Sequence, residues 1–476
     1  MVTGDLPRET KLLVVGGGPG GYAAAFRAAD LGLDVTLVSE DARLGGVCLL
    51  RGCIPSKALL TLSDLILTAR EAQEGGIIFG EPEVHIDAVR RWKDAVVEQL
   101  VGGLDYLCER RGVRRVEGRA RFTDSGSVRI EGSGGGTLEF QHCIIASGSR
   151  PIPLAGGEFD ERVMDSGRAL DLPDVPQTLL VVGGGYVGLE MGMVYATLGS
   201  AVTLVEMTDR LMPRADADLV EPIAKRVAGL FEAIHLETRV TALEEGESEV
   251  SVQLEGDIEE PEAAFERVLV AIGRRPNSDD LGLDTTEVEV DDDGFIQVDD
   301  QRRTSDARIF AIGDATGGHM LAHEAMHEGK VAAEVIAGEP AAFDARAVPA
   351  VVYTDPQLAW CGLTEREAES AGREVRVERF PWSASGRAVS MGASHGMTKL
   401  LADPETGRLL GAGVVGPQAE VLISELVLAM EMGAVTRDLA STIHPHPTLS
   451  ETVGEAAELF LGGSTHFKRA EGKADG

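Results

Sequence analysis

Two of the five cysteines, Cys48 and Cys53, lie close together in the chain with Gly52 between them. Five residues along a regular α-helix rotate by about 500°, which would point the two thiols about 140° apart. A disulfide needs Cβ atoms about 3.5–4.5 Å apart, so the pair can bridge only if the turn is distorted, which Gly52 would ease. A strained, accessible disulfide is easily reduced and suits redox catalysis. A zinc half-site or two unpaired thiols are the alternatives. A second Cys or His pair at metal-ligand spacing is missing, so we expect no metal.

A second group that could do chemistry lies near the C-terminus, where His446 is followed, five positions later, by Glu451. A carboxylate held against an imidazole can orient it as a general base. By itself such a pair is more often a surface ion pair, and we expect the neighbouring His444 to be structural. Redox-active cysteines would give the pair a task, because a thiol must lose its proton before it attacks a disulfide.

Two glycine-rich turns share the spacing G-x-G-x-x-G, at Gly16, Gly18 and Gly21 and again at Gly183, Gly185 and Gly188. Each turn follows a short apolar run and opens a helix-like stretch. Glycines in this setting permit a tight turn and the close approach of the backbone to a pyrophosphate, which then lies on the helix N-terminus. One such turn is weak evidence, but two of them in a strand–turn–helix setting predict two bound dinucleotides.

The acidic residue that closes each unit determines which ribose it accepts. Glu206 lies 18 residues after Gly188, where a carboxylate accepts hydrogen bonds from free ribose hydroxyls and repels a 2′-phosphate, so the second unit is predicted to select NAD over NADP. In the first unit the same count reaches Ser39, with Glu40 one position later. Either Glu40 takes the role through a small backbone shift, or Ser39 binds the ribose more weakly.

The elements that position these residues follow an α/β pattern that occurs twice. From about residue 348, short strands alternate with helices, which indicates a separate α+β domain. The predicted fold class is therefore α/β, with two Rossmann-like dinucleotide-binding domains and an α+β C-terminal domain. The predicted strand–helix–strand units are 11–15, 22–31 and 34–38, then 179–182, a helix through 198 and 201–205.

The composition of the 476 residues, 43% hydrophobic and 26% charged, suits a globular protein of about three domains. Acidic residues outnumber basic ones 78 to 44, and the net charge of −34 argues against nucleic acid and anionic membranes as partners. Because the chain has no run of about 18 uncharged apolar residues and no evident signal peptide, we expect a cytoplasmic protein without a membrane span.

Only 8 of the 44 basic residues are lysines. Strong negative charge with few lysines is what a protein adapted to a salty cytosol would have, so the chain is predicted to be halophilic. The alternative is an acidic protein from a GC-rich genome, in which arginine codons displace lysine.

The cysteine segment, residues 45–57, resembles the redox-disulfide signature of the flavoprotein disulfide reductases. Val47 stands where Thr is usual in that family, and Leu50 and Arg51 stand where Asn and Val are usual. Residues 183–190 are similar to the family's NAD turn, and residues 309–314 to its second FAD motif. Residues 320–325 and 444–451 look more like the lipoamide branch than the glutathione or mercuric reductases. The resemblance covers nearly the whole chain.

This resemblance implies a role for each candidate catalytic residue. Cys48 would attack the substrate, and Cys53 would form the charge-transfer pair with the flavin. Lys57 and Glu190 would pair beside the isoalloxazine. His446, supplied by the other subunit and oriented by Glu451, would be the base.

The resemblance also implies an FAD domain at 1–150, an NAD domain at 151–277, a central segment at 278–347 that completes the FAD site, and a dimerisation domain at 348–476. Asp314 would hold the ribityl chain of FAD. Further cofactor contacts are expected at Lys57, Gly118, Ser147, Gly148, Ala322 and Gly273.

The function so implied is FAD-dependent oxidation of protein-bound dihydrolipoamide to lipoamide, with reduction of NAD. The partners would be a second copy of the chain and a lipoyl-bearing subunit of a 2-oxo acid dehydrogenase complex or glycine cleavage system. The alternative is an NADPH-dependent reductase of another disulfide or thiol, against which Glu206 and residues 446–451 argue. A non-catalytic binding subunit is a third reading, disfavoured by the intact cysteines, histidine and glycine turns.

Overall fold

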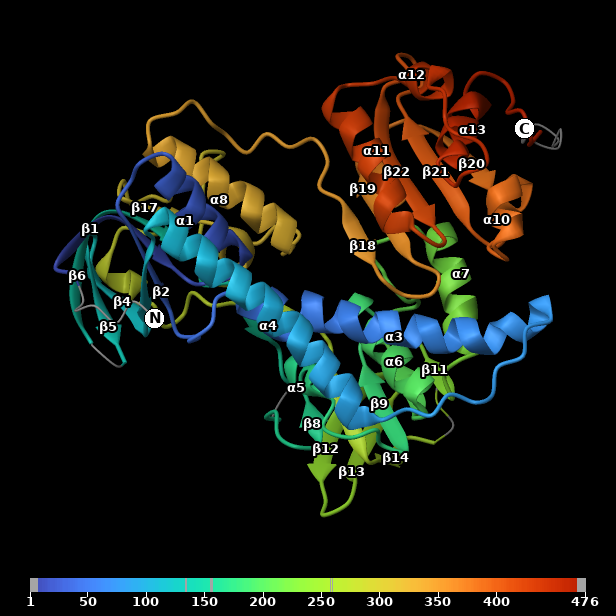
Figure 1. The fold of residues 1–476 in the computed structure, drawn as a ribbon, viewed down its shortest axis with the longest axis horizontal. Helices are drawn as coiled ribbons and strands as arrows, with labels where there is room; N and C mark the ends of the chain where they lie inside the picture. The colour runs from blue at the N-terminus through green and yellow to red at the C-terminus, as the bar shows by residue number, and fades with distance from the viewer. Residues whose placement is uncertain (1–6, 133–134, 155–156, 257, 259, 469–476) are drawn as a thin grey trace. The chain divides into compact units, whose positions relative to one another are not determined.

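The computed structural model describes residues 7–132, 135–154, 157–256, 258 and 260–468. The described chain forms two compact units, coloured by residue number in Figure 1. The first unit contains the residues up to Thr61 together with Glu81–Asp174 and Val270–Asp344. The second contains Leu62–Gly80, Val175–Leu269 and the residues from Ala345 onward. Each unit therefore combines segments that are far apart in the sequence.

The first unit is built on a seven-stranded sheet, in which β3, β2, β1, β6 and β17 are parallel and β5 and β4 extend it as antiparallel strands. The central strand β1 is apolar and buried, with Leu12, Leu13 and Val14 at 0% exposure. The strands are β1 (Glu9–Val15), β2 (Val35–Ser39), β3 (Arg114–Glu117), β4 (Arg119–Asp124), β5 (Ser127–Glu131), β6 (Gly136–Ile145) and β17 (Ile309–Ala311). This is the parallel core predicted for the first nucleotide-binding domain.

Helices α1 (Pro19–Asp30) and α8 (Ala322–Ile336) lie side by side in the first unit (Figure 1). Small residues allow this close approach, because a Cβ at Gly329 would lie 2.6 Å from the carbonyl oxygen of Gly20. The other elements of this unit are α4 (Ile86–Arg111), β7 (Ser149–Pro151) paired with β16 (Arg274–Pro276), β8 (Val163–Met164), α5 (Ser166–Asp171), η2 (Leu283–Thr285) and η3 (Gly313–Thr316).

The cysteine segment forms two helices. Helix α2 (Gly46–Arg51) ends at Gly52, and α3 (Cys53–Glu71) begins immediately after it and leads into η1 (Ala72–Gly75). A Cβ at position 52 would lie 2.8 Å from the carbonyl oxygen of Val47, so only glycine fits this break. The regular helix is therefore interrupted between the two cysteines.

The second unit repeats the strand–turn–helix pattern. Strands β9, β10 and β11 are parallel, and β15 continues their sheet. A separate antiparallel sheet has the order β12-β13-β14. The elements are β9 (Thr178–Val182), α6 (Tyr186–Leu198), β10 (Ala201–Val205), α7 (Ala217–Ala228), β11 (Ala233–His235), β12 (Arg239–Glu245), β13 (Val250–Glu255), β14 (Glu262–Phe265) and β15 (Arg267–Val270).

The C-terminal part of the second unit is a five-stranded sheet of order β18-β19-β22-β21-β20 with helices. Its core centres on Trp382 and Phe380, which are at most 1% exposed. The elements are β18 (Ala350–Val352), β19 (Leu358–Gly362), α9 (Glu365–Ser370), β20 (Arg376–Pro381), η4 (Trp382–Ala384), α10 (Gly386–Ser390), β21 (Met397–Ala402), β22 (Leu409–Val415), α11 (Ala419–Glu431), α12 (Thr436–Ser441) and α13 (Glu451–Leu459). The predicted fold class, two Rossmann-like domains and an α+β domain, is confirmed.

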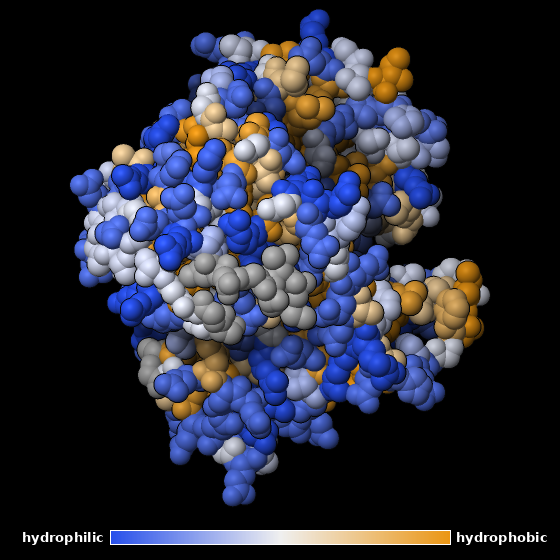
Figure 2. Space-filling view, turned by 60° about the vertical axis from the view of Figure 1, so that its left-hand side comes forward, coloured by the Kyte–Doolittle hydropathy of each residue, from blue (hydrophilic) through white to orange (hydrophobic). Residues whose placement is uncertain are grey.

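Most of the surface seen in Figure 2 is hydrophilic, as the net charge of −34 leads one to expect. Apolar exceptions occur in the C-terminal domain, where Leu428 is 62% exposed and Met432 is 76% exposed. By length and composition, one helical stretch of the described chain, Gly46–Gly75, could cross a membrane. It contains Lys57 and Asp64, so it is not an uncharged run. It is weak evidence for a span, because core helices of soluble proteins pass the same test.

Candidate active site

The first glycine turn forms a cradle that side chains would fill. A Cβ at Gly16 would lie 2.1 Å from the carbonyl oxygen of Ala146, and one at Gly21 would lie 1.9 Å from that of Gly16. At Gly18, by contrast, the nearest atom to such a Cβ is the Cα of Gly46 at 3.9 Å. Helix α1 begins directly after Gly18, so its free N–H groups face this open side. The turn therefore fits a pyrophosphate.

Around this cradle lie the other residues predicted to contact FAD. The hydroxyl of Ser147 is buried and has no hydrogen-bond partner among the described residues, which suits a site completed by a ligand. Asp314 lies in η3 and accepts a hydrogen bond from the Ser149 hydroxyl at 2.5 Å. Gly148 follows Ser147 with a φ of +72°, and Ala322 opens α8. These residues all belong to the first unit.

The end of β2 presents both ribose candidates. Ser39 is the last residue of the strand, and its carbonyl oxygen accepts from the N–H of Gly118 at 2.9 Å. Glu40 is exposed, and its Oε1 lies 3.2 Å from Nε of Arg119.

The second glycine turn holds its acidic residue firmly. Glu206 is 8% exposed and accepts from the N–H of Gly184 at 2.7 Å through Oε2. Its Oε1 accepts from both the N–H and the hydroxyl of Thr208, each at 2.8 Å. A Cβ at Gly185 would have no atom within 4 Å, so this turn is also open at the position that corresponds to Gly18. A carboxylate fixed in this way is prepared to bind ribose hydroxyls.

Gly188 and Gly273 are the other two residues predicted to contact the second cofactor. A Cβ at Gly188 would lie 2.0 Å from the carbonyl oxygen of Gly183, which repeats the close contact of the first turn. Gly273 has a φ of +129°, and its carbonyl oxygen accepts from the N–H of Ile152 at 3.1 Å.

The two cysteines lie together across the break between α2 and α3. Cys48 is partly buried and Cys53 is exposed, and both are thiols. A hydrogen bond with Cys53 and burial raise the pKa of Cys48 far above its usual value, and the nearby positive charge of Lys57 opposes this rise. A pair in this position can pass between thiol and disulfide.

Sequence reasoning missed Tyr22 and Asp41. Burial, followed by the nearby Cys48 and Cys53, raises the pKa of Tyr22 to about 12, so a neutral phenol stands beside the redox pair. Asp41 accepts two hydrogen bonds from the Arg51 guanidinium, at 2.9 and 2.8 Å. Two features of the sequence could have indicated them. Tyr22 directly follows the first glycine turn, and Arg51, the partner of Asp41, is a departure from the family signature.

In the second unit, His446 and Glu451 form the predicted pair. Nδ1 of His446 lies 2.8 Å from Oε1 of Glu451, whose Oε2 accepts from the N–H of Thr448 at 2.8 Å. Partial burial raises the pKa of Glu451, but the hydrogen bonds from Thr448 and His446 outweigh burial and lower it overall. The carboxylate therefore stays ionised and accepts the Nδ1 proton, which leaves Nε2 of His446 as a base.

The predicted catalytic residues are divided between the two units. Cys48, Cys53 and Lys57 belong to the first, whereas Glu190, His446 and Glu451 belong to the second. Glu190 is 3% exposed on α6 and accepts from the N–H of Tyr353 at 2.9 Å. The pairing of Lys57 with Glu190 and the approach of His446 to a disulfide remain predictions.

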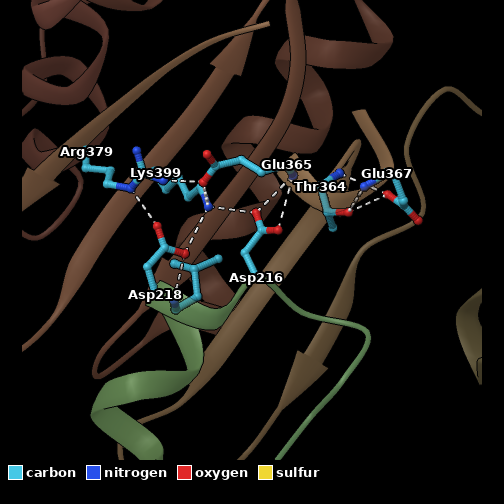
Figure 3. Close-up of polar contacts among 8 residues, drawn as sticks. Asp216, Asp218, Thr364, Glu365, Glu367, Arg379 and Lys399 are labelled. Carbon is cyan, nitrogen blue, oxygen red and sulfur yellow. Dashed lines mark hydrogen bonds and ion pairs between the residues drawn. The ribbon is translucent and has the colours of Figure 1, made fainter. Parts of the chain in front are cut away.

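A cluster of charges that the sequence did not predict is drawn in Figure 3. Asp216, Asp218 and Glu365 lie close enough together to suggest a cation site among the described residues. Lys399 is 0% exposed, and its Nζ lies 2.7 Å from Asp216 and 2.9 Å from Asp218 and also pairs with Glu365. Arg379 binds Asp218 at 2.5 Å and pairs with Glu365. The cluster is thus an ion-pair network around the buried Lys399 and Asp216, and it joins the start of α7 to the C-terminal sheet.

Comparison with known proteins identifies the family. Residues 10–329 match the family model described as pyridine nucleotide-disulphide oxidoreductase, and residues 348–457 match its dimerisation domain. The chain belongs to the pyridine nucleotide-disulphide oxidoreductase family. FAD, implied by the resemblance, and NAD, predicted from Glu206, are the cofactors of this family. The dimerisation domain supports the predicted homodimer.

Relatives in this family match nearly the whole chain. A protein of Haloferax volcanii is 49% identical over 98% of this chain and 99% of its own length. One of Halobacterium salinarum is 47% identical over 98% and 99%, and one of Vibrio parahaemolyticus is 48% identical over 96% and 97%. Each is named dihydrolipoyl dehydrogenase.

Solved structures agree on the fold. LpdA of Mycobacterium tuberculosis has a TM-score of 0.87 at 27% identity, covering 94% of this chain and 99% of its own. The HOCl-induced flavoprotein disulfide reductase RclA of Escherichia coli, solved with Cu(II), has a TM-score of 0.83 at 27% identity, covering 95% and 100%.

Proposed function

We propose that this flavoprotein disulfide oxidoreductase is a dihydrolipoyl dehydrogenase. It oxidises protein-bound dihydrolipoamide to lipoamide and reduces NAD, through a disulfide formed by Cys48 and Cys53. The observation that carries the proposal is the His446–Glu451 pair, with Nδ1 held 2.8 Å from an ionised carboxylate and Nε2 available as a base. A dithiol substrate needs such a base, because its thiols must ionise before they attack a disulfide.

The side chains of His446, Cys48 and Cys53 account for the proton transfer and the disulfide exchange. Nε2 of His446 takes the proton from one substrate thiol, and the resulting thiolate attacks the sulfur of Cys48. The Cys48–Cys53 bond breaks, and Cys53 leaves as a thiolate. The second substrate thiol then attacks the mixed disulfide and passes its proton to the leaving Cys48, which releases lipoamide. The substrate has lost two electrons to the cysteine pair. FAD held at the first glycine turn and NAD held at the second would supply the acceptors for this electron pair.

Other residues hold the cofactors and the base in place. The glycine turns at Gly16–Gly21 and Gly183–Gly188 cradle the pyrophosphates of FAD and NAD. By resemblance to the family, Lys57 and Glu190 would pair beside the flavin ring. Glu206 selects NAD, because its carboxylate is fixed by Gly184 and Thr208 and would face a 2′-phosphate with like charge.

The partner that supplies the substrate is a lipoyl-bearing subunit of a 2-oxo acid dehydrogenase complex or of the glycine cleavage system, in the cytoplasm. In the homodimer, His446 of one subunit serves the disulfide of the other. The chain spans 97–99% of the length of relatives named dihydrolipoyl dehydrogenase. Among the residues that the structure describes, no specific contact favours the alternative, an NADPH-dependent reductase of another disulfide.

A substrate comparison tests the proposal. Purified holoenzyme is given dihydrolipoamide with NAD, and in parallel oxidised glutathione or another disulfide with NADPH. We expect rapid NADH formation in the first reaction and little NADPH consumption in the second. The opposite ranking would overturn the assignment.

A further inference from the structure

The two glycine turns match residue by residue, and this match identifies the ribose position in the first. In the first unit Val15 pairs with Val38, and in the second Val182 pairs with Val205. The N–H of Gly16 donates to the carbonyl oxygen of Val38 at 2.8 Å, and that of Gly183 donates to Val205 at 2.8 Å. The next residue along each strand is therefore equivalent: Ser39 in the first unit and Glu206 in the second.

The surroundings of the two positions agree as well. A Cβ at Gly184 would lie 3.2 Å from both Cβ and Oε2 of Glu206 and 2.7 Å from a methyl of Leu211. A Cβ at Gly17 would lie 2.8 Å from Oγ of Ser39, and 3.1 Å from a methyl of Leu44. In each turn the second residue, Gly17 or Gly184, thus lies between a leucine and the residue at the end of the second strand. Ser39 directs its hydroxyl to the place where Glu206 directs its carboxylate.

Glu40 has another partner. Its Oε1 lies 3.2 Å from Nε of Arg119, which also binds Asp280 at 2.8 Å. The Glu40 side chain is 65% exposed. Glu40 and Asp280 therefore share one arginine at the surface. Glu40 lies one position beyond Ser39, the residue that faces the turn.

Building on the proposed FAD site, we propose that Ser39, not Glu40, binds the adenosine ribose of FAD. The first site thereby has a neutral hydroxyl where the second has a carboxylate. A hydroxyl gives a neutral hydrogen bond, whereas a carboxylate gives a charge-assisted bond of about twice the strength. The protein therefore holds the FAD ribose less tightly than the carboxylate in the second site would permit.

FAD release from the holoenzyme tests this inference. The FAD dissociation constant is obtained by dilution with flavin fluorescence as the readout, and the temperature of FAD release is measured on heating. Ser39→Ala should weaken FAD binding by about 2–10-fold, the effect of one neutral hydrogen bond. Ser39→Glu should strengthen binding by several-fold, because it copies the second site. Glu40→Gln should leave both readouts unchanged. Glu206→Ser is the matched control at the second turn, and it should also leave FAD release unchanged.

A loss of FAD affinity in Glu40→Gln without one in Ser39→Ala would overturn the inference, as would no change in either Ser39 variant. The readout does not depend on turnover, so the inference and the proposed function can fail separately. A wild-type enzyme that retains FAD but does not oxidise dihydrolipoamide would contradict only the proposed function. Normal turnover with Ser39 variants that hold FAD like wild type would contradict only the inference.

Discussion

The two nucleotide-binding turns differ less in their backbone than in the side chains beside it. Both have the same glycine spacing, the same strand register and the same 2.8 Å hydrogen bond from the first glycine to the second strand. At the end of that strand the first turn has Ser39 and the second has Glu206. The comparison shows that the same glycine pattern forms the same tight turn in both units. We expect the residue at the end of the second strand to determine which ribose is held and how strongly.

The two regions also differ in what lies next to the cradle. The first unit adds Cys48 and Cys53 at the break between α2 and α3. The second unit adds a buried acid, Glu206, and carries the His446–Glu451 pair in its C-terminal sheet domain. Electrons should therefore enter through the side chains of the first unit and leave through the nucleotide of the second.

The largest effect is expected from changes to the cysteine pair, which lies in the first unit. Changing Cys48 or Cys53 to Ser should abolish dihydrolipoamide oxidation, because no disulfide can form, but FAD should stay bound because the cradle lies elsewhere. The flavin absorbance of the purified variants and their turnover with dihydrolipoamide check this. Cys108→Ser, a change at a buried cysteine, is the matched control. Full turnover in either redox-pair variant would remove the redox role.

The next effect separates the base from the cofactors. His446→Gln should slow dihydrolipoamide oxidation by about 10²–10⁴-fold, as expected for a lost general base, while reduction of the flavin by NADH should change little. Stopped-flow absorbance of the two half-reactions provides the measurement. His444, which binds Glu425 at 2.8 Å, supplies the control variant His444→Gln. Equal slowing of both half-reactions by His446→Gln would mean that the residue supports the fold rather than acting as the base.

The pH dependence of the same half-reaction sharpens this point. The pKa of Glu451 is lowered, so its carboxylate stays ionised as the pH falls through the range in which an imidazole titrates. We therefore expect protonation of Glu451 itself to cause no loss of rate between about pH 5 and 8. Glu451→Gln removes the charge that orients His446 and should slow dihydrolipoamide oxidation throughout this range. An unchanged rate in the variant would contradict the role of Glu451.

A smaller effect is expected from a substitution that makes the second turn resemble the first. Glu206→Ser should reduce the preference for NAD over NADP by about 10–100-fold, because a like-charge contact costs a few kcal/mol. The ratio of kcat/KM for the two nucleotides measures it. If the variant keeps the full NAD preference, Glu206 is not the selecting group.

The smallest and least local effect concerns salt. With a net charge of −34, repulsion at low ionic strength should loosen the fold and the dimer, and molar salt reduces the Debye length to about 3 Å. We expect the melting temperature and the activity to rise between 0.05 and 2 M KCl. A flat response would leave genome composition as the explanation of the scarce lysines.

The sequence was most informative where chemistry depends on local spacing. The glycine turns, and the count that leads from each turn to Ser39 and Glu206, follow from residues within one strand–turn–helix unit, but the choice between Ser39 and Glu40 required the strand register of the structure. The sequence could not reveal that Arg119 binds Glu40, since the two are 79 positions apart. Nor could it reveal the network of Lys399 with Asp216, 183 positions away. Such ion pairs depend on which distant strands and helices pack together, and no local pattern records that.

The most direct test of the account follows electrons from the first region to the second. The oxidised holoenzyme is reduced without oxygen by one equivalent of dihydrolipoamide per flavin, and NAD or NADP is then added while the absorbance spectrum is recorded. We predict a long-wavelength thiolate-to-flavin band after dihydrolipoamide, followed by about one equivalent of NADH with NAD and almost none with NADP. A protein that dihydrolipoamide does not reduce, or that transfers its electrons to NADP as readily as to NAD, would contradict the account.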